Sequence, residues 1–196
     1  MITVVYGSAR KNGNTDMLAD AFIKGTGLKE DSIKRFYLRN MKLQPCTACG
    51  GCDTTGICIY DDQIWSIFRE MDKSDFLLIA SPITFASVTA QAKAYIDRGQ
   101  AFWVRKFVLG LNPPIIQSEN QGTPKSKKGF FISVGGMNTQ KYFQNAKMVV
   151  QTFMVSTGFK YSGELFFPGV DKKGEIAEKP DAIAAAETAG RDFINI

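Results

Sequence analysis

Short apolar segments alternate with amphipathic stretches along this sequence, and this alternation constrains the fold more than any other feature. The segment DFLLIAS, residues 75–81, carries an unbroken apolar run, which is typical of a central parallel strand buried on both faces. Four other strands are expected at residues 2–7, 33–38, 128–136 and 159–167. Helices are expected at residues 14–25, 61–74, 87–100, 141–158 and 180–194. This alternation predicts a three-layer α/β domain with a parallel sheet.

Local signals indicate where some of these helices begin and end. An aspartate of the DD pair at residues 61 and 62 is expected to cap the second helix, because its carboxylate can accept a bond from a first-turn N–H group. Gly158 is expected to stop the helix before it, and Pro180 opens the last helix at a position that tolerates proline.

The length of 196 residues, with 44% hydrophobic and 22% charged residues, suits one sizeable core. A single domain over residues 1–196 is therefore expected. The sequence opens on an apolar strand with no signal-peptide pattern, and FLLIA, its longest apolar run near the middle, is far shorter than the roughly 20 residues of a membrane-spanning helix. We expect a cytoplasmic protein with no membrane segment.

The net charge of +5 comes from basic residues that are spread along the chain. The tight clusters are Lys125, Lys127 and Lys128 on one segment and Lys172 and Lys173 on another. They fit either solvated loop charges or a docking face for an acidic redox partner. No nucleic-acid motif accompanies them, so no nucleic-acid partner is expected.

Residues 101–127 interrupt the alternation and are expected to form a long loop. Pro113, Pro114 and Pro124 rule out a continuous helix there. Phe102, Trp103 and Phe107 either pack beneath this loop as a satellite of the core or meet a second copy of the chain.

The loops that follow the strands are the expected binding region, since ligands of open parallel sheets bind at the carboxyl ends of the strands. GSARKNGNT, residues 7–15, leads straight into a helix and combines small residues with hydroxyl groups and Arg10. It favours a monophosphate at the helix N-terminus, although an ordinary turn before a capped helix is the alternative. It matches neither a GxxxxGK[ST] nucleotide loop nor a GxGxxG fingerprint.

Two further loops suit a flat aromatic ring. The loop after residue 80, SPITFAS, presents apolar and hydroxyl surface beside the strand end, and SVGG at residues 133–136 lets a ligand approach the backbone. Each of these loops taken alone is more often a simple turn.

Taken together, three segments resemble the iron-sulfur flavoprotein branch of the NADPH-dependent FMN reductase family. They are GSARKNGNT, the C-x2-C-x2-C-x5-C run followed by IYDD, and SPITFASVTAQAKAYIDR. The resemblance is strong over residues 1–100 and weaker beyond. It implies a flavodoxin-like fold with a five-stranded parallel sheet, order 2-1-3-4-5, that binds FMN at its strand ends.

The resemblance also implies which residues contact FMN. The phosphate would be held by Ser8, Arg10, Asn14 and Thr15. The isoalloxazine ring would be lined by Ser81, Pro82, Ile83, Thr84 and Phe85, and approached from the other side by Ser133, Gly135 and Gly136. Thr84 departs from the family pattern, in which an aromatic residue is common, so the ring loses a stacking partner or takes one from another subunit.

The cysteine loop, residues 45–59, holds every cysteine of the chain: Cys46, Cys49, Cys52 and Cys58. Crowded thiols in a reducing cytosol are more often metal or redox ligands than a disulfide framework. The resemblance implies that they hold a [4Fe-4S] cluster, and Gly50, Gly51 and Gly56 would permit the positive-φ turns that such a loop needs. Zinc and a metal-free packing role stay open as alternatives.

Two cofactors would divide the redox work, with electrons passing between the cluster and FMN. The chain has no histidine, which excludes Ser-His and Cys-His catalytic arrangements and leaves the chemistry to cofactors. NAD(P)H is a candidate donor. The resemblance implies that the cluster of one subunit serves the FMN of another, in a homo-oligomer that is a dimer or tetramer. An acidic electron-transfer protein such as ferredoxin is the other expected partner.

Two other functions stay open at this point. One is a cluster-free NAD(P)H-dependent FMN or quinone reductase, and the other is a non-enzymatic flavin-binding redox sensor. Turnover that survives replacement of Cys49 would favour the first, and a partner affinity that changes with redox state would favour the second.

Overall fold

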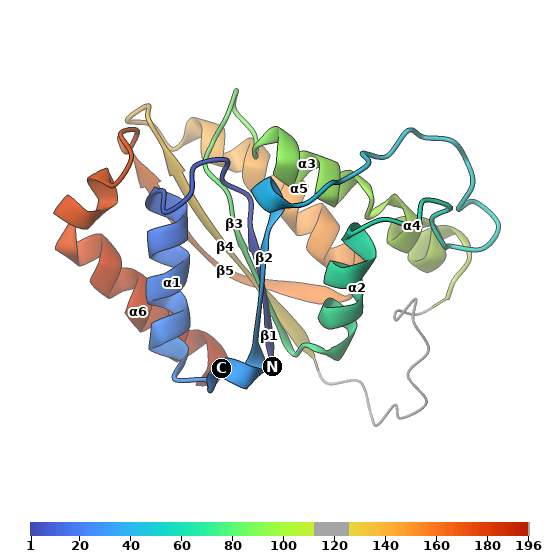
Figure 1. The fold of residues 1–196 in the computed structure, drawn as a ribbon, viewed down its shortest axis with the longest axis horizontal. Helices are drawn as coiled ribbons and strands as arrows, with labels where there is room; N and C mark the ends of the chain where they lie inside the picture. Colours follow the sequence, from blue (N-terminus) through green and yellow to red (C-terminus); the bar gives the residue numbers. More distant parts are fainter. Residues whose placement is uncertain (112–125, 196) are drawn as a thin grey trace.

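The computed structural model describes residues 1–111 and 126–195, and within them five parallel strands form one sheet in the order β2-β1-β3-β4-β5 (Figure 1). The strands are β1 (Ile2–Tyr6), β2 (Ile33–Tyr37), β3 (Phe76–Ala80), β4 (Lys127–Gly135) and β5 (Phe159–Pro168). Each β1 residue pairs with one residue of β2 and one of β3, so β1 lies inside the sheet. The predicted fold class and strand order are confirmed.

Helices cover both faces of the sheet (Figure 1). One face carries α1 (Asn14–Thr26) and α6 (Pro180–Asn195). The other carries α2 (Ile64–Lys73), α3 (Ala90–Asp97), α4 (Gln100–Trp103) and α5 (Lys141–Ser156). Short 3-10 segments lie at Glu30–Ser32, Leu38–Asn40 and Glu175–Glu178.

The first and last helices approach so closely that their backbones touch through glycine. A Cβ atom added at Gly190 would lie 1.9 Å from the carbonyl oxygen of Phe22, and one added at Gly25 would lie 1.8 Å from that of Glu187. Since real Cβ atoms essentially never approach below 3.0 Å, only glycine fits at these two crossing points. Small residues in α6 thus set the spacing of the two helices.

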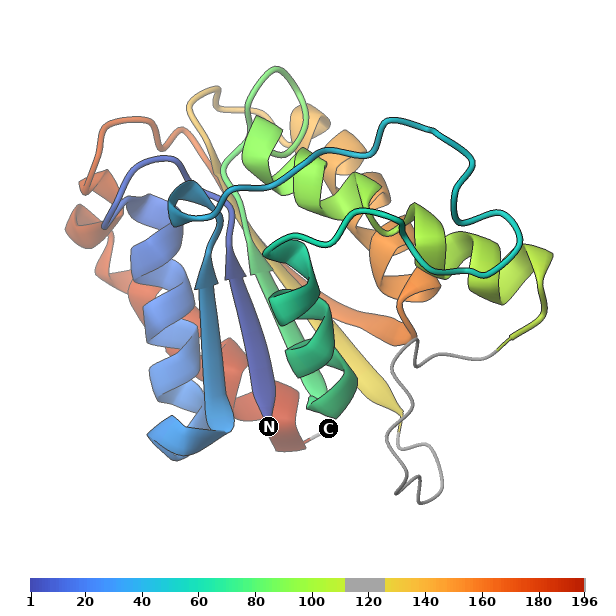
Figure 2. The same ribbon diagram turned by 45° about the vertical axis from the view of Figure 1, so that its right-hand side comes forward.

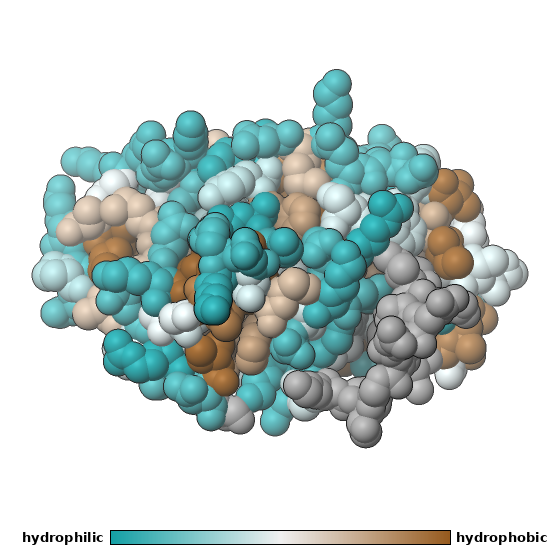
Figure 3. Space-filling view, turned by 60° about the horizontal axis from the view of Figure 1, so that its bottom comes forward, coloured by the Kyte–Doolittle hydropathy of each residue, from teal (hydrophilic) through white to brown (hydrophobic). Residues whose placement is uncertain are grey.

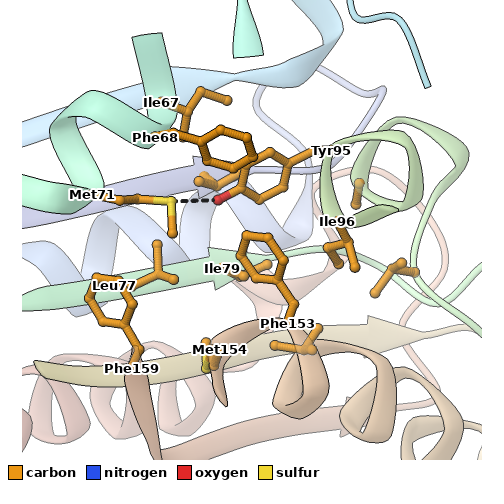
Figure 4. Close-up of a cluster of buried hydrophobic side chains, with 14 of the residues drawn as sticks. Ile67, Phe68, Met71, Leu77, Ile79, Tyr95, Ile96, Phe153, Met154 and Phe159 are labelled. Atoms are coloured by element: carbon orange, nitrogen blue, oxygen red, sulfur yellow. Dashed lines mark hydrogen bonds between the residues drawn. The ribbon is translucent and has the colours of Figure 1, made fainter. Parts of the chain in front are cut away.

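The core is divided by the sheet into two clusters of buried side chains. In the cluster beneath α2, α3 and α5, Phe68 and Phe153 flank Tyr95, whose hydroxyl group points at Met71 (Figure 4). The Tyr95 hydroxyl donates to the Met71 sulfur at 2.9 Å, and burial raises the pKa of this phenol well above its ordinary value. The polar end of the tyrosine is therefore satisfied inside an otherwise apolar layer.

Two of the expected helix ends are confirmed, whereas the helices expected at residues 61–74 and 87–100 begin later, at Ile64 and Ala90. As expected, α6 begins at Pro180, and α5 ends two residues before Gly158, which has a φ of 85°. The second helix begins at Ile64 rather than at residue 61, and the expected aspartate contact is made by Asp62, whose side chain accepts the Ile64 N–H at 3.1 Å. Asp62 also pairs with a buried arginine, described below.

The segment over residues 101–108 is helical, so the loop expected from residue 101 does not begin there; the described residues 109–111 are not helical. After α4 the chain continues as a π-helical turn over Val104–Val108. Phe102 is buried against Phe68, with ring centroids 4.7 Å apart, whereas Trp103 and Phe107 remain exposed on the surface. Pro113, Pro114 and Pro124 lie outside the described residues.

Lys127 begins β4 and has a structural role that the clustered lysines did not suggest. Its ammonium group donates to the carbonyl oxygens of Met71 and Asp72, at 3.0 and 2.7 Å, at the C-terminal end of α2. These carbonyls belong to the last turn of α2, where the Met71 oxygen also accepts the N–H of Ser74 at 3.1 Å, so the lysine side chain adds a charged cap to this helix end. Burial lowers the pKa of Lys127, although its ammonium group keeps these two carbonyl acceptors.

Replacing Lys127 with methionine is expected to lower the free energy of unfolding by about 1–2 kcal/mol, because two carbonyl groups lose a charged donor. Denaturant unfolding measures the change. Lys128→Met, at the next residue, is the control and is expected to stay within about 0.5 kcal/mol of the parent protein. Equal effects of the two substitutions would contradict the capping role.

Within residues 1–111 and 126–195, no helix is both long and apolar enough to cross a membrane.

Candidate functional site

The loops after β1, β3 and β4 meet at the carboxyl end of the sheet, at the top of the molecule in Figure 2. The parallel arrangement brings them together, because all strands of such a sheet end at the same edge. The cysteine loop runs along the side of this edge, between β2 and α2.

The loop after β1 forms a cradle with free hydrogen-bond capacity at the start of α1. Gly13 is the N-cap of this helix and provides no side-chain cap, so the first N–H groups keep their capacity. The Thr15 hydroxyl is buried, and it has no hydrogen-bond partner. Ser8 is also buried, and its hydroxyl accepts the backbone N–H of Arg10 at 3.1 Å, which closes the loop. An anion with oxygen atoms would satisfy these groups.

Two side chains from neighbouring elements hold this cradle in place. The Thr89 hydroxyl donates to the carbonyl oxygen of Gly7 at 2.5 Å while it also caps α3. Arg39 donates to the carbonyl oxygen of Ser8 at 3.3 Å and pairs with Asp16 at 3.0 Å. Burial raises the pKa of Asp16, and Arg39 opposes that rise.

Arg10 and Asn14 are engaged by the loop after β5. Arg10 donates to the carbonyl oxygen of Asp171 at 2.6 Å, and the Asn14 amide donates to that of Lys172 at 2.9 Å. The Asn14 side-chain oxygen also accepts the N–H of Ile176 at 3.2 Å. These contacts place both residues beside the cradle and fasten a second loop to it.

A cavity of about 620 Å³ opens between the loops after β3 and β4. Its wall includes Ile83, Phe85, Gly135 and Gly136 from the predicted set, and it also includes Met137, Tyr142, Phe143 and Asp171. A Cβ atom added at Gly135 would lie 3.2 Å from the Phe143 ring and 3.5 Å from Ile83. The missing side chain therefore keeps the floor of this cavity open.

A tight turn carries an aromatic ring at the rim of the same cavity. Thr84 and Ser87 exchange two backbone hydrogen bonds, and the two residues between them have positive φ values, 46° for Phe85 and 60° for Ala86. This is the backbone of a type I′ turn, which glycine or asparagine usually occupies. Phe85 therefore holds a strained conformation with its side chain fully exposed.

Ser81 directly follows β3, Ser133 lies near the end of β4, and both bond to the protein itself. Both are completely buried, and the Ser133 hydroxyl donates to the carbonyl oxygen of Ser81 at 2.7 Å. The Ser81 hydroxyl accepts the N–H of Thr89 at 3.1 Å. Of the other predicted residues, Pro82 is half-buried and Thr84 is exposed.

The four cysteines line one cavity of about 370 Å³, together with Asp97 and Arg98 from the end of α3. All four are free thiols, with Cys49 exposed and the others half-buried. Burial, reinforced by Asp53, raises the pKa of Cys52. Among the described residues, no three His, Cys, Asp or Glu side chains are placed to hold a single metal ion.

The glycines of the cysteine loop differ in what they do. Gly50 and Gly56 have positive φ values of 74° and 66°, as predicted, whereas Gly51 does not. Gly51 instead lies against Ile59, and a Cβ atom there would lie 2.5 Å from this exposed side chain, which would have to move. Ala48 also has a positive φ, 52°, which the sequence did not indicate.

Comparison with known proteins identifies the family. The family described as NADPH-dependent FMN reductase matches residues 1–159 of this chain. The chain belongs to the NADPH-dependent FMN reductase family. Curated iron-sulfur flavoproteins are among its relatives, which confirms the predicted branch: one from Archaeoglobus fulgidus is 30% identical over 66% of this chain, and one from Methanosarcina thermophila is 30% identical over 69%.

These alignments cover 60% and 63% of the two relatives' own lengths. Among solved structures, the Trp repressor binding protein from Bacillus subtilis matches with a TM-score of 0.62 and 21% identity, and the match covers 95% of this chain and 97% of that chain. This structural likeness supports the flavodoxin-like fold of this family member.

Several residues of this family member's candidate site were missed by sequence reasoning. Tyr142 and Met137 line the larger cavity, and Thr89, Arg39 and Arg98 support the two loops. Tyr142 could have been found, because it lies in the first turn of the helix that follows the SVGG loop. The partners of Arg98 are more than 30 residues away in the sequence, so no local pattern indicates them.

Proposed function

We propose that this protein is an FMN-binding oxidoreductase that transfers electrons between FMN at the strand ends and a [4Fe-4S] cluster held by the cysteine loop. Electrons would enter from, or leave to, a redox partner or a small acceptor, with NAD(P)H as a candidate donor. The observation that carries the proposal is that all four cysteines line one cavity, separate from the strand-end cavity.

The residues around the strand ends fit FMN. The uncapped start of α1 and the unpartnered Thr15 hydroxyl offer donors to a phosphate group. The cavity beside Gly135 and Gly136 is apolar on the Ile83 and Phe143 side, as an aromatic ring system requires.

In this proposal Ser8 shapes the phosphate loop, Arg10 and Asn14 border it, and Phe85 covers the ring. Pro82 and Thr84 border the ring, while Ser81 and Ser133 support it from below.

The cysteine loop fits a cluster better than a single ion. Each iron of a [4Fe-4S] cluster takes one cysteine thiolate, so the four sulfur atoms surround the cluster instead of converging on one point. That requirement agrees with four thiols around one cavity and with the lack, among the described residues, of a group placed for one ion.

When bound, FMN accepts two electrons together or passes them singly, and a [4Fe-4S] cluster moves one electron at a time. The chain's own residues would position these groups and limit access to them. Thr89 and Arg39 hold the phosphate loop, and the strained turn keeps Phe85 at the rim of the ring cavity. In this proposal no side chain transfers a proton.

The direct test is the iron, acid-labile sulfide and FMN content of protein purified without oxygen. About four irons, four sulfides and one FMN per chain are expected. FMN without iron, after reconstitution has also been tried, would contradict the cluster proposal but not the proposed flavin site.

A cluster-free NAD(P)H-dependent FMN or quinone reductase is the second candidate. It is supported by the match of residues 1–159 to the NADPH-dependent FMN reductase family, which by itself calls for no cluster. NADPH-dependent quinone turnover that is undiminished in Cys49→Ala would select this function, because it needs no electron route through the cysteine loop.

Replacing Thr15 with valine is expected to weaken FMN binding about tenfold or more, because the substitution removes a donor to a charged phosphate while it keeps the side-chain shape. Thr15→Ser keeps the hydroxyl and is expected to bind within about threefold of the parent protein. Fluorescence titration of the apoprotein with FMN measures both. Riboflavin, which lacks the phosphate, should bind the valine variant and the parent protein equally.

We further propose a homo-oligomer, a dimer or tetramer, that works in the cytoplasm. Four free cysteines suit a reducing compartment. Hydrophobic residues show at the right-hand end of the molecule in Figure 3, as well as elsewhere on this face. On the helical segment after residue 100, exposed Trp103 and Phe107 have ring centroids 6.0 Å apart. Sedimentation of the flavin-loaded protein tests this oligomeric state.

The net charge of +5 favours an acidic electron carrier such as ferredoxin as a partner, and the rate of electron transfer to it should then fall with added salt.

A further inference from the structure

Arg98 is a buried arginine that ties the two ends of the cysteine loop together. Its side chain is 1% exposed and extends from the end of α3. One guanidinium nitrogen, Nη1, donates to the carbonyl oxygen of Gln44 at 2.8 Å and to Asp62 Oδ2 at 2.7 Å. The other, Nη2, donates to the carbonyl oxygen of Tyr60 at 3.0 Å. Residues 45–59, which carry every cysteine, lie between these anchor points.

The partners of Arg98 strengthen this attachment. The same Asp62 oxygen that pairs with Arg98 accepts the N–H of Gln44 at 3.1 Å. The Trp65 indole donates to the carbonyl oxygen of Tyr60 at 2.8 Å, and the guanidinium lies 5.4 Å from the centre of the Tyr60 ring. The loop can therefore vary between its ends while the ends themselves stay fixed.

Arg98 also contributes charge where the thiols gather. It lines the 370 Å³ cavity together with all four cysteines and is the one cationic residue among the described residues of its wall. Two carboxylates, Asp53 and Asp97, line the same cavity, and Asp97 is paired outward with Lys93 at 2.7 Å. Thiolates crowded into such a cavity repel one another, and a buried cation beside them offsets part of this repulsion.

We propose that Arg98 is the positioning residue of the cysteine loop, and that its buried charge raises the reduction potential of the redox centre that the loop holds. The inference rests on the proposed function for the identity of that centre. Arginine suits both roles, because its planar fork donates to several acceptors at once and keeps its charge when buried. Lysine would supply the charge from a single nitrogen and could not reach both ends of the loop.

The first test measures how firmly the loop holds its iron. In Arg98→Met, purified without oxygen, loss of iron to a chelator is expected to be about 10- to 100-fold faster than in the parent protein, as for other residues that support metal ligands. Arg98→Lys is expected to fall between the two. Arg69→Met is the charge-matched control, because Arg69 is exposed on α2, and it should release iron at the parent rate. An unchanged rate in both Arg98 variants would overturn the positioning role.

The second test separates charge from structure. Arg98→Met is expected to lower the midpoint potential of the cluster, because it removes a positive charge and leaves Asp62 unpaired. Asp62→Asn is expected to raise it, because it removes the opposing negative charge. A tenfold change in the redox equilibrium corresponds to about 59 mV for one electron. Shifts of opposite sign cannot arise from loosening alone, and shifts of the same sign in both variants would overturn the electrostatic role.

A third measurement distinguishes failure of this inference from failure of the proposed function. If the parent protein binds no iron after reconstitution, the cluster proposal fails, but the positioning role remains testable in the iron-free protein. Alkylation of the four thiols is then expected to be faster in Arg98→Met and in Arg98→Lys than in Arg69→Met. Equal FMN content in all variants shows that the domain is folded. Equal alkylation rates would overturn the inference with the fold intact.

Discussion

Replacing Gly190 with alanine is expected to lower the free energy of unfolding by about 3 kcal/mol or more. The new methyl group would lie 1.9 Å from the carbonyl oxygen of Phe22, which is part of a helix backbone and cannot rotate away. The two helices would have to separate, and the buried side chains between them would lose contact. Since natural domains are stable by only about 5–15 kcal/mol, this loss is large. Denaturant unfolding measures it.

Gly27→Ala provides a matched control for the same change of residue. Gly27 ends α1 with a φ of 64°, and an added Cβ atom would meet nothing within 4 Å. Its substitution is expected to cost only about 1–2 kcal/mol, from backbone conformation alone. If Gly190→Ala cost no more than Gly27→Ala, the close approach of α1 and α6 would be refuted.

Replacing Cys49 with alanine is expected to abolish the iron and sulfide content of the protein while one FMN per chain is retained. The substitution removes one of four ligands, and a cluster that lacks a protein ligand is exposed to loss. Cys49 is the most informative of the four, because it is exposed and contributes no packing to the core. The free energy of unfolding of the iron-free protein should therefore change by less than about 0.5 kcal/mol. Iron and sulfide analysis beside the flavin spectrum measures the effect.

Thr54→Ala is the control for the cysteine substitution. Thr54 is exposed on the same loop, so its loss should leave iron, sulfide and FMN at parent levels. Full iron content in Cys49→Ala would show that this thiol is not a ligand. Loss of iron in both variants would instead indicate that the loop tolerates no change, and the ligand assignment would lose its support.

The fold could be predicted from the sequence because its signals are local. An unbroken apolar run such as FLLIA can only be buried on both faces, and β3 is buried at Leu77 through Ala80. Pro180 marked the start of α6 correctly for the same reason, since its effect acts on its own turn. The order of the strands came from the family resemblance rather than from any local pattern.

The side chains and helix ends that hold the site in place could not be predicted from local patterns. Lys127 looks like one of several surface lysines, yet it caps a helix that ends more than 50 residues earlier in the chain. The extension of helix past residue 100 was missed because the prolines that argue against it lie further along. Contacts between distant residues decide these features, and a single sequence carries no record of them.

The third helix has a consequence for how this protein can be altered. Thr89 at its start bonds to Gly7 in the loop after β1, and Arg98 at its end bonds to both ends of the cysteine loop. A helix rises about 1.5 Å per residue, so these two attachment points are held roughly 13 Å apart along its axis. We therefore expect that the segment between Gln44 and Tyr60 can be lengthened or shortened without moving α3 relative to the strand-end cavity, provided that the core contacts of Cys52 and Cys58 are kept.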